Sequence, residues 1–169
     1  MRVDRRDIQR VIDVRASTDS VWREVTRLDI SAFPHPPYLS IFGIPKPLRA
    51  EILRPGVGGA RIAYFARNRR FSQEITDWQP GRRYAFTFQA DPGFRVGYLL
   101  DLSDGPFRMV AGAYEMSATS IGTRLSLFSE YELRGTAGAF LRVPVRVVLG
   151  LFQHYLLRSI RANAERAGS

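Results

Sequence analysis

The sequence predicts an α+β fold, in which a curved seven-stranded antiparallel sheet wraps around a long C-terminal helix and two short helices follow the first strand. Two observations favour this fold. Between Leu48 and Leu133, short β-type segments alternate with turns rich in glycine, proline and asparagine. From about Ala139 to Arg166, apolar residues recur with helical spacing. We expect a single domain over residues 1–169, because no repeat or linker-like stretch interrupts the chain.

The N-terminal elements are predicted to be short. β-branched residues between Val11 and Arg15 indicate a first strand. Ser17 is a typical helix N-cap, and the apolar stripe that follows it predicts a short helix. The stretch from Asp29 to Lys46 contains four prolines among apolar residues, which predicts a second short helix and a rigid loop.

Six further strands and the C-terminal helix complete the prediction. Short turns would join these strands as antiparallel neighbours, because parallel strands need longer crossovers. The regular part of the helix should begin at Pro144 or just before it, since proline disrupts a helix interior. The six expected strands are Leu48–Arg54, Ala60–Ala66, Phe71–Trp78, Arg83–Gln89, Arg108–Ala118 and Thr123–Leu133.

The turns allow these strands to be phased against one another. A two-residue turn at Asn68-Arg69 predicts the facing pairs Ile62 with Ile75 and Tyr64 with Gln73. A turn at Pro80-Gly81 predicts the pairs Gln73 with Phe88, Ile75 with Phe86 and Asp77 with Tyr84. In the last hairpin, Val110, Gly112, Tyr114 and Met116 should lie beside Leu125, Leu127, Ser129 and Tyr131. The first two turns agree on one apolar, tyrosine-rich face, which we expect the C-terminal helix to cover.

Polar groups on this apolar face predict a ligand cavity. Gln73, Asp77 and several tyrosines would be buried there, and an unpartnered buried polar group costs about 1–3 kcal/mol. A cavity for an amphipathic ligand accounts for them better than a solid core does. We also expect Asp91–Asp104 to pack over one mouth of this cavity as a lid, through Tyr98 and Leu100. The predicted ligand-binding residues are Ile62, Tyr64, Gln73, Ile75, Tyr84, Phe86, Phe88, Tyr98, Tyr114, Leu127, Tyr131 and Phe152.

The composition argues against several other functions. The chain has no cysteine and two histidines, His35 and His154, so we expect no metal site and no cofactor. As a general base, His35 would need a partner, and the sequence offers no evident one. The N-terminus is too polar for a signal peptide, and no apolar run has transmembrane length, so we expect a cytoplasmic protein.

The net charge of +9 comes from 24 arginines and one lysine, against 16 acidic residues. A codon-composition bias toward arginine explains this skew more simply than phosphate binding does, because lysine also binds phosphate. The basic clusters lie at opposite ends of a shared strand, so we expect no nucleic-acid site. Two interpretations of the outer face of the C-terminal helix stay open: a weak peripheral contact with an anionic membrane, or an ordinary solvated face. The residues of that face are Arg142, Arg146, Arg158 and Arg161, beside Val147, Leu151 and Leu157.

The chain resembles the START/polyketide-cyclase superfamily, also called SRPBCC or helix-grip proteins. The resemblance rests on four stretches and spans nearly the whole chain. The block that ends in Trp78-Gln79-Pro80-Gly81-Arg82 is the most specific of them. The stretches are Val14-Arg15-Ala16-Ser17 to Val21-Trp22, Pro55–Gly59, Phe71–Arg83 and Gly122–Leu125.

The resemblance implies the fold and the cavity but not one reaction, since the superfamily includes lipid carriers, polyketide cyclases, hormone receptors and ubiquinone-binding proteins. Two functions are therefore expected. The first is binding of a small hydrophobic or aromatic ligand, such as a polyketide, an isoprenoid quinone or a lipid-like chain. The alternative is a polyketide cyclase or dehydratase that uses the same cavity. For such chemistry the sequence offers Asp77, the tyrosines and His35, without an evident acid–base pair, which favours binding.

Overall fold

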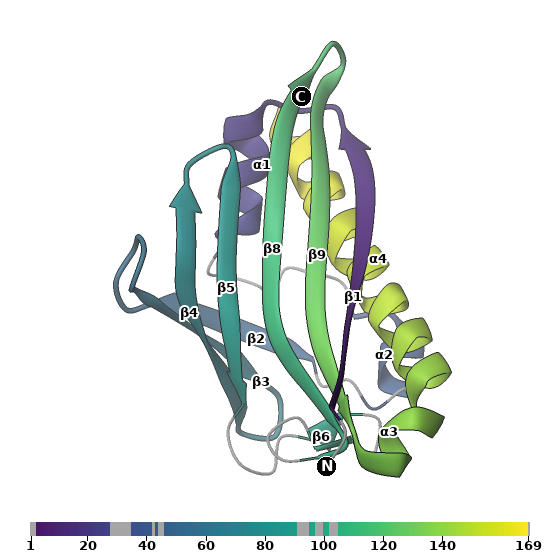
Figure 1. The fold of residues 1–169 in the computed structure, drawn as a ribbon. Coiled ribbons are helices and arrows are strands. Elements are labelled where there is room, and N and C mark those ends of the chain that lie inside the picture. Colours follow the sequence, from purple (N-terminus) through teal and green to yellow (C-terminus); the bar gives the residue numbers. More distant parts are fainter. Residues whose placement is uncertain are drawn as a thin grey trace.

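A seven-stranded antiparallel sheet curves around helix α4, as the sequence predicts (Figure 1). The computed structural model describes residues 3–27, 35–41, 43, 46–90, 95–96, 100–101 and 105–168. The strand order is β1-β9-β8-β5-β4-β3-β2, so the first and last strands of the chain lie next to each other. The strands are β1 (Val3–Val14), β2 (Pro47–Ile52), β3 (Ala60–Phe65), β4 (Arg69–Gln79), β5 (Arg83–Ala90), β8 (Phe107–Thr119) and β9 (Gly122–Arg134).

Strand β1 is much longer than the sequence pattern indicated. It begins at Val3 instead of near Val11, and every one of its residues is paired with β9. Along most of the strand, exposed residues alternate with partly buried ones. The outward positions hold mostly charged or polar residues, which weaken the strand signal in the sequence.

Four helices complete the described fold: α1 (Thr18–Val25), α2 (Pro37–Ile41), α3 (Gly135–Phe140) and α4 (Arg142–Ala167). The N-cap of α1 is the predicted Ser17, whose Oγ accepts a hydrogen bond from the Ser20 amide at 3.2 Å. Helix α4 begins at Arg142, which places Pro144 in its first turn. A first-turn proline is tolerated because the N–H that it lacks has no partner within the helix.

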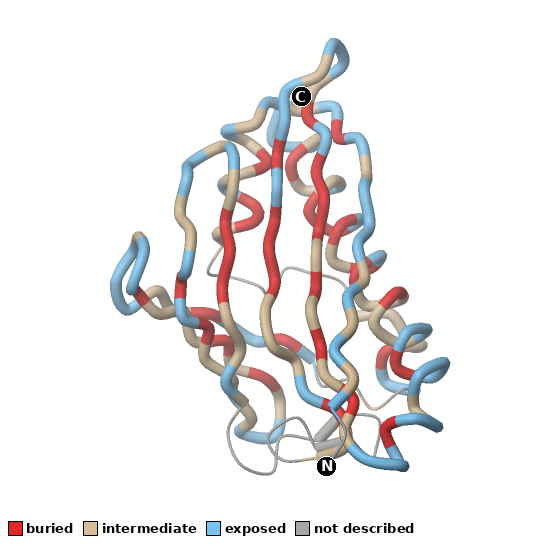
Figure 2. Tube along the Cα trace, viewed as in Figure 1, coloured by how far each residue is buried: buried red, intermediate tan, exposed pale blue. Residues whose placement is uncertain are grey.

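The core lies between the concave face of the sheet and the two helices α1 and α4. Figure 2 shows that buried residues concentrate along the central strands β5, β8 and β9, whereas β1 and the turn tips are exposed. At one end of the core, Trp22 of α1 packs edge-on against Trp78 with ring centroids 5.0 Å apart. Trp78 makes a similar edge-on contact with Tyr84 at 5.5 Å. These rings fasten α1 to the sheet.

The expected register between β3 and β4 is wrong. A three-residue turn replaces the expected two-residue turn, with Arg67 and Asn68 in the left-handed region at φ 65° and 57°. Ile62 therefore pairs with Ser72 and Tyr64 with Arg70. Because the register moves by an odd number of residues, every side chain of β3 changes face.

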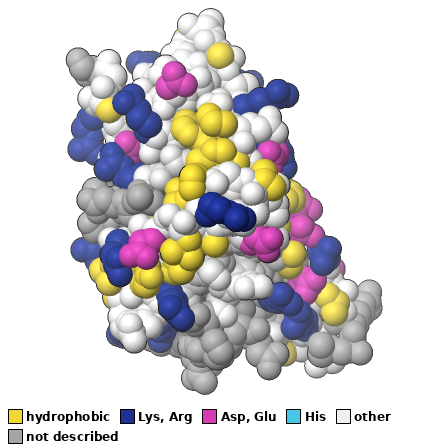
Figure 3. All heavy atoms as spheres, turned by 90° about the vertical axis from the view of Figure 1, so that its left-hand side faces the viewer, with side chains coloured by type: hydrophobic (Ala, Val, Ile, Leu, Met, Phe, Trp, Pro, Cys, Tyr) yellow, Lys and Arg dark blue, Asp and Glu magenta, His cyan; other side chains and the backbone are white. Residues whose placement is uncertain are grey.

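Ile62 and Tyr64 consequently lie on the outer face of the sheet. The Tyr64 hydroxyl donates to Glu51 Oε2 at 3.3 Å, and the guanidinium of Arg49 sits 4.3 Å from the centre of the tyrosine ring. Figure 3 views the molecule from the side on which β3 and β4 lie in Figure 1. Hydrophobic side chains form a band in the middle of this view, between basic and acidic ones.

The other two hairpins follow the predicted register until a bulge interrupts it. Gln73 faces Phe88 and Ile75 faces Phe86, as expected. A bulge between Ile75 and Asp77 then brings Trp78, not Asp77, opposite Tyr84, so the expected Asp77 pairing is wrong. In the last hairpin, the pairs Met116 with Leu125, Tyr114 with Leu127 and Gly112 with Ser129 are confirmed, but a bulge places Met109 instead of Val110 beside Tyr131.

The segment Asp91–Asp104 is described in two short pieces, β6 (Arg95–Val96) and β7 (Leu100–Asp101). These strands pair with each other in a separate two-stranded sheet and do not join the main sheet. Tyr98 and the side chain of Leu100 lie outside the part of the chain that the structure describes, so the expected lid contact through them stays a prediction.

Candidate functional site

A cavity of about 120 Å³ lies between the concave face of the sheet and helix α4. Its walls come from strands that are distant in the sequence, β2, β3, β4, β5, β8 and β9, and from the end of α1 and the middle of α4. Most of its surface is apolar, with a few polar groups from several elements. Among the residues predicted to bind a ligand, those that line it are Gln73, Phe86, Phe88, Tyr114, Leu127 and Phe152.

The other predicted residues lie elsewhere. Ile75 and Tyr84 are buried in the main core cluster, on the same face of the sheet but outside the cavity lining. Tyr131 belongs to a second cluster, formed with Phe107, Leu133 and Val145. Ile62 and Tyr64 point to the opposite face, because the turn before β4 has one more residue than expected. Tyr98 is outside the described residues.

Arg61 is the most informative lining residue that the sequence analysis missed. The corrected register brings Arg61, Ala63 and Phe65 of β3 to the inner face, where all three line the cavity. One terminal nitrogen of Arg61 donates to the carbonyl oxygen of Arg27 at 2.8 Å. Its Nε is buried and has no hydrogen-bond partner among the described residues. A cationic donor therefore contributes to the cavity wall.

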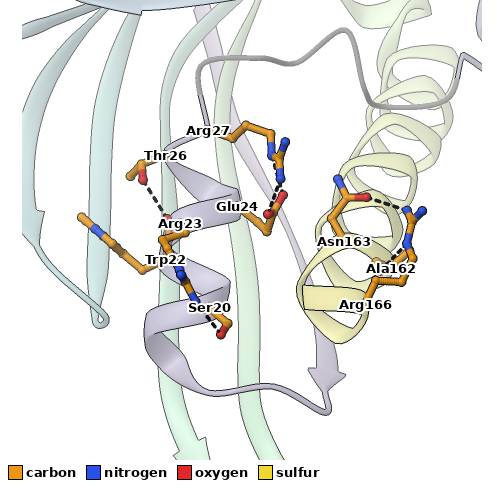
Figure 4. Close-up of polar contacts among 9 residues, drawn as sticks. All are labelled: Ser20, Trp22, Arg23, Glu24, Thr26, Arg27, Ala162, Asn163 and Arg166. Carbon is orange, nitrogen blue, oxygen red and sulfur yellow. Dashed lines mark hydrogen bonds and ion pairs between the residues drawn. The ribbon is translucent and has the colours of Figure 1, made fainter. Parts of the chain in front are cut away.

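An acidic group lies at the same wall. Glu24, on the last turn of α1, is 6% exposed and lines the cavity. Arg27 reaches back to it with two hydrogen bonds, from Nε at 2.7 Å and from a terminal nitrogen at 2.6 Å (Figure 4). This bidentate pairing neutralises the carboxylate, which would be costly to bury alone. This pairing is not predictable from residue spacing, because opposite charges three residues apart are common on solvated helices.

Tyrosine hydroxyls add further polarity near this wall. The Tyr84 hydroxyl donates to Gln73 Oε1 at 3.2 Å, and both residues are buried. Burial raises the pKa of Tyr84, and burial raises the pKa of Tyr114 to about 12, in both cases against the opposing charge of Arg61. Burial and the nearby Tyr38 raise the pKa of Tyr155, another lining residue, to about 12. These phenols are therefore neutral near pH 7 and can donate hydrogen bonds, but they are poor bases.

Gln153 supplies a polar group from α4. It is 1% exposed and its Nε2 donates to the carbonyl oxygens of Ile8 and Leu127, at 3.1 and 3.2 Å, and to Ser129 Oγ at 2.9 Å. Its Oε1 is buried and no described residue donates to it. Gln153 thus ties α4 to β1 and β9 and leaves one acceptor at the cavity.

Two of the residues considered for catalysis from sequence, Asp77 and His35, are not among the lining residues, whereas the tyrosine Tyr114 is. Asp77 is on the outer face, where its Oδ2 lies 3.1 Å from Arg83 Nε. His35 Nε2 is 3.1 Å from Ser40 Oγ, and burial together with the charge of Lys46 lowers the pKa of His35. The lining residues include no histidine. Within the described ranges no three metal-ligating side chains come together, and no helix combines the length and apolar character that a membrane span requires.

Comparison with known proteins identifies the fold. No family model matches the sequence, and no curated protein sequence is similar to it. The chain superposes on the Zhui aromatase/cyclase from Streptomyces with a TM-score of 0.59 and 19% identity, over 96% of this chain and 95% of that one.

Two further solved structures are similar over the same extent of this chain. Ara h 8.0201 gives a TM-score of 0.62 at 11% identity, with 95% of this chain and 98% of that one covered. The di-domain aromatase/cyclase StfQ of the steffimycin biosynthetic pathway gives 0.61 at 16% identity, with 98% of this chain and 52% of that one covered. The seven-stranded sheet, the short helices after β1 and the long C-terminal helix are those of these proteins. The chain therefore has the helix-grip fold of these proteins.

Proposed function

We propose that the chain binds a small hydrophobic or aromatic ligand that carries at least one polar group, in the cavity between the sheet and α4. The observation that supports this most directly is a set of three buried polar atoms at a largely apolar cavity that have no hydrogen-bond partner among the described residues: Arg61 Nε, Gln153 Oε1 and the Tyr155 hydroxyl. A buried polar atom without a partner costs about 1–3 kcal/mol. A ligand with a hydroxyl or carbonyl group would recover part of that cost.

The cavity volume limits the part of the ligand that enters. At about 120 Å³ it approaches an engineered cavity of about 150 Å³ that binds benzene. Pockets for drug-sized ligands are larger, at about 300–1,000 Å³. A single substituted ring fits this space, and a polycyclic polyketide, a quinone with its isoprenoid tail or a fatty acyl chain would require the walls to move.

A direct test compares two probes of nearly equal shape, p-cresol and p-xylene, by calorimetry. A hydroxyl that finds a partner is worth about 1 kcal/mol, so we expect p-cresol to bind several-fold more tightly. Replacing Arg61 with methionine should reduce this preference, because methionine keeps an unbranched apolar stem without the guanidinium donors. Equal affinity of the two probes for the unmodified chain would contradict the polar part of the proposal.

A cavity-filling variant tests the position of the ligand. Ala63 is 6% exposed and lines the cavity. The substitution Ala63→Leu adds three carbon atoms at this position, and they would occupy the space of the ligand. Ala60→Leu makes the same change on the outward face of the same strand and is the matched control. We expect A63L to lose binding of both probes and A60L to retain it, with thermal unfolding showing that both variants fold. Binding that persists in A63L would place the ligand elsewhere.

The alternative function is a polyketide cyclase or dehydratase, and two of the similar structures are described as aromatase/cyclases. Glu24 is the carboxylate that lines the cavity, and in this role it would act as a general base once released from Arg27. The test incubates the protein with a poly-β-ketone thioester. The enzyme is favoured if the unmodified chain converts this substrate and the Glu24→Gln variant does not, although the variant still binds p-cresol. Bound substrate without product would favour the carrier, and native mass spectrometry of the purified protein would identify any ligand it retains.

A further inference from the structure

The end of α3 and the start of α4 expose four hydrophobic side chains, which we call the apolar stripe: Phe140, Val143, Pro144 and Val147. Phe140 is 85% exposed, Val143 71% and Val147 51%. Within α4, the spacing of three and four residues puts Val147 on the same side of the helix as Pro144 and Val143, and Phe140 is the last residue of α3, two residues before α4 begins. They lie beyond the sheet, at the end of the molecule where the chain begins (Figure 1).

The hydrophobic residues are exposed on one face of α4, while the opposite face of the same helix is well packed. Val145, on the opposite side of the same turn, is 2% exposed and packs with Tyr131 and Leu133. The following turns of α4 line the cavity through Leu149 and Phe152. The helix is therefore anchored along its inner side while its outer side presents large apolar groups to the surroundings. Such a patch marks an interaction surface more often than scattered single residues do.

The charged side chains that α4 itself places beside the stripe are both arginines. Arg142 and Arg146 are exposed on the same two turns, and Arg142 makes an ion pair with Asp4 at 3.0 Å. No ion pair joins Arg146 in the described part of the chain. Between Glu132 and Glu165 the sequence contains five arginines and no acidic residue. A surface that covers the stripe must therefore accept hydrophobic groups and tolerate, or prefer, positive charge.

We propose that the apolar stripe and its two arginines dock the protein on the surface of an anionic lipid bilayer. Hydrophobic side chains on one helix face enter the interface between headgroups and acyl chains, and flanking arginines contact the anionic headgroups. A second copy of the chain fits less well, because symmetric contact through this face would bring arginines together without a carboxylate from the helix. Docking in this way does not depend on the ligand proposed above.

The structure corrects the wider basic face that the sequence suggested. Leu157 is 2% exposed and belongs to the core, so it cannot contact a membrane. Arg158 and Arg161 lie several turns further along α4, past the last exposed large apolar residue, Val147. The docking surface is thus confined to the end of α3 and the first turns of α4.

Vesicle sedimentation tests the proposal with the full chain. We expect binding to phosphatidylcholine vesicles that contain phosphatidylserine, little binding to phosphatidylcholine alone, and loss of binding at high salt. V143E/V147E should weaken binding at least tenfold, because it places charge in the stripe and keeps good helix formers. The matched control is V57E/I121E, which alters two valine- or isoleucine-sized residues that are 65% and 60% exposed in turns. R142Q/R146Q should weaken binding by about fivefold for each arginine, whereas R23Q/R67Q should have a smaller effect.

Other occupants of the stripe would give different results. If V143E/V147E converts a dimer into a monomer in sedimentation velocity, the stripe contacts a second copy and the membrane proposal fails. If binding to a single-stranded oligonucleotide depends on the arginines but not on the stripe, the positive charge serves nucleic acid instead. Equal sedimentation of V143E/V147E and the unmodified chain also overturns the proposal. None of these outcomes alters the probe-binding test of the cavity.

Discussion

Replacing Gln153 with glutamate tests the polar contact that holds α4 on the sheet. The two side chains have the same shape, but the oxygen that replaces Nε2 would lie 3.1 and 3.2 Å from the carbonyl oxygens of Ile8 and Leu127. An amide nitrogen has two hydrogens and a protonated carboxyl has one, so the change leaves at least one buried carbonyl oxygen without its donor at a site that is 1% exposed. We expect a loss of about 2 kcal/mol in the free energy of unfolding from this cause alone.

The introduced carboxyl adds a pH-dependent cost. Facing two carbonyl oxygens away from water, it would keep its proton, so its folded-state pKa would rise well above the ordinary value of about 4.3. Below pH 4.3 the carboxyl is protonated in both the folded and the unfolded state, so it causes no pH-dependent loss. Between pH 4.3 and the folded-state pKa only the unfolded state releases the proton, so the free energy of unfolding falls by up to about 1.4 kcal/mol per pH unit. We expect the total loss to grow from about 2 kcal/mol at pH 4 to about 5 kcal/mol at pH 7.

Urea unfolding followed by tryptophan fluorescence measures both effects. With a slope of about 2 kcal/mol per molar urea, the midpoint at pH 7 should fall by about 2 M or more. Gln9→Glu is the matched control, since Gln9 is exposed on β1, and it should change stability by less than about 0.5 kcal/mol. If Q153E unfolds at the same midpoint as the unmodified chain at pH 7, the amide oxygen and not the nitrogen faces β1 and β9, and the reasoning is refuted.

Three further changes test other contacts. Tyr84→Phe removes the hydrogen bond to Gln73 and should lower the free energy of unfolding by about 1 kcal/mol in urea; an unchanged value would mean that the contact is not formed. Gly112→Ala would place a Cβ 2.8 Å from two ring atoms of Phe86, so the ring must shift toward the cavity. We expect a loss of about 1–3 kcal/mol and weaker p-cresol binding in calorimetry, and unaltered binding would count against this cavity wall. Hydrogen bonds from two arginines lower the pKa of Glu132 below 4.5, so its contribution to stability is present above pH 4.5 and is lost as the pH falls through the lowered value. Glu132→Gln should therefore flatten acid unfolding monitored by circular dichroism, and an equally steep curve would exclude this residue as a cause.

The sequence predicted the register of β4 and β5 correctly up to Ile75 because only one face of each strand carries large apolar residues there. In β3 this signal fails, since Ile62 and Tyr64 are as apolar as Ala63 and Phe65 on the other side. Period-two alternation cannot say which face is buried when both are apolar. The length of the turn between β3 and β4 determines which face of β3 is buried. Arg67 in this turn has a left-handed backbone conformation, which arginine as a residue type does not predict.

Bulges are the second reason that parts of the site were missed. One extra residue in β4 exchanges Asp77 for Trp78 at the inner face, and no residue near Thr76 is typical of a bulge. The polar lining residues Arg61, Glu24 and Gln153 follow from tertiary packing. Each looks like a solvated residue within its own segment and is buried only because distant elements meet there.

The pairing of β1 with β9 has a consequence for biosynthesis. β1 is made first, but its pairing partner β9 begins at Gly122, so more than a hundred residues must leave the ribosome before β1 can be hydrogen-bonded. Contacts this distant in sequence form slowly, and a strand that waits unpaired can associate with other chains. The three arginines and two aspartates between Asp4 and Arg10 discourage such association, because charges along an open strand edge resist pairing with a foreign strand. The charged residues that hid β1 from the sequence analysis are thus suited to protect the nascent chain.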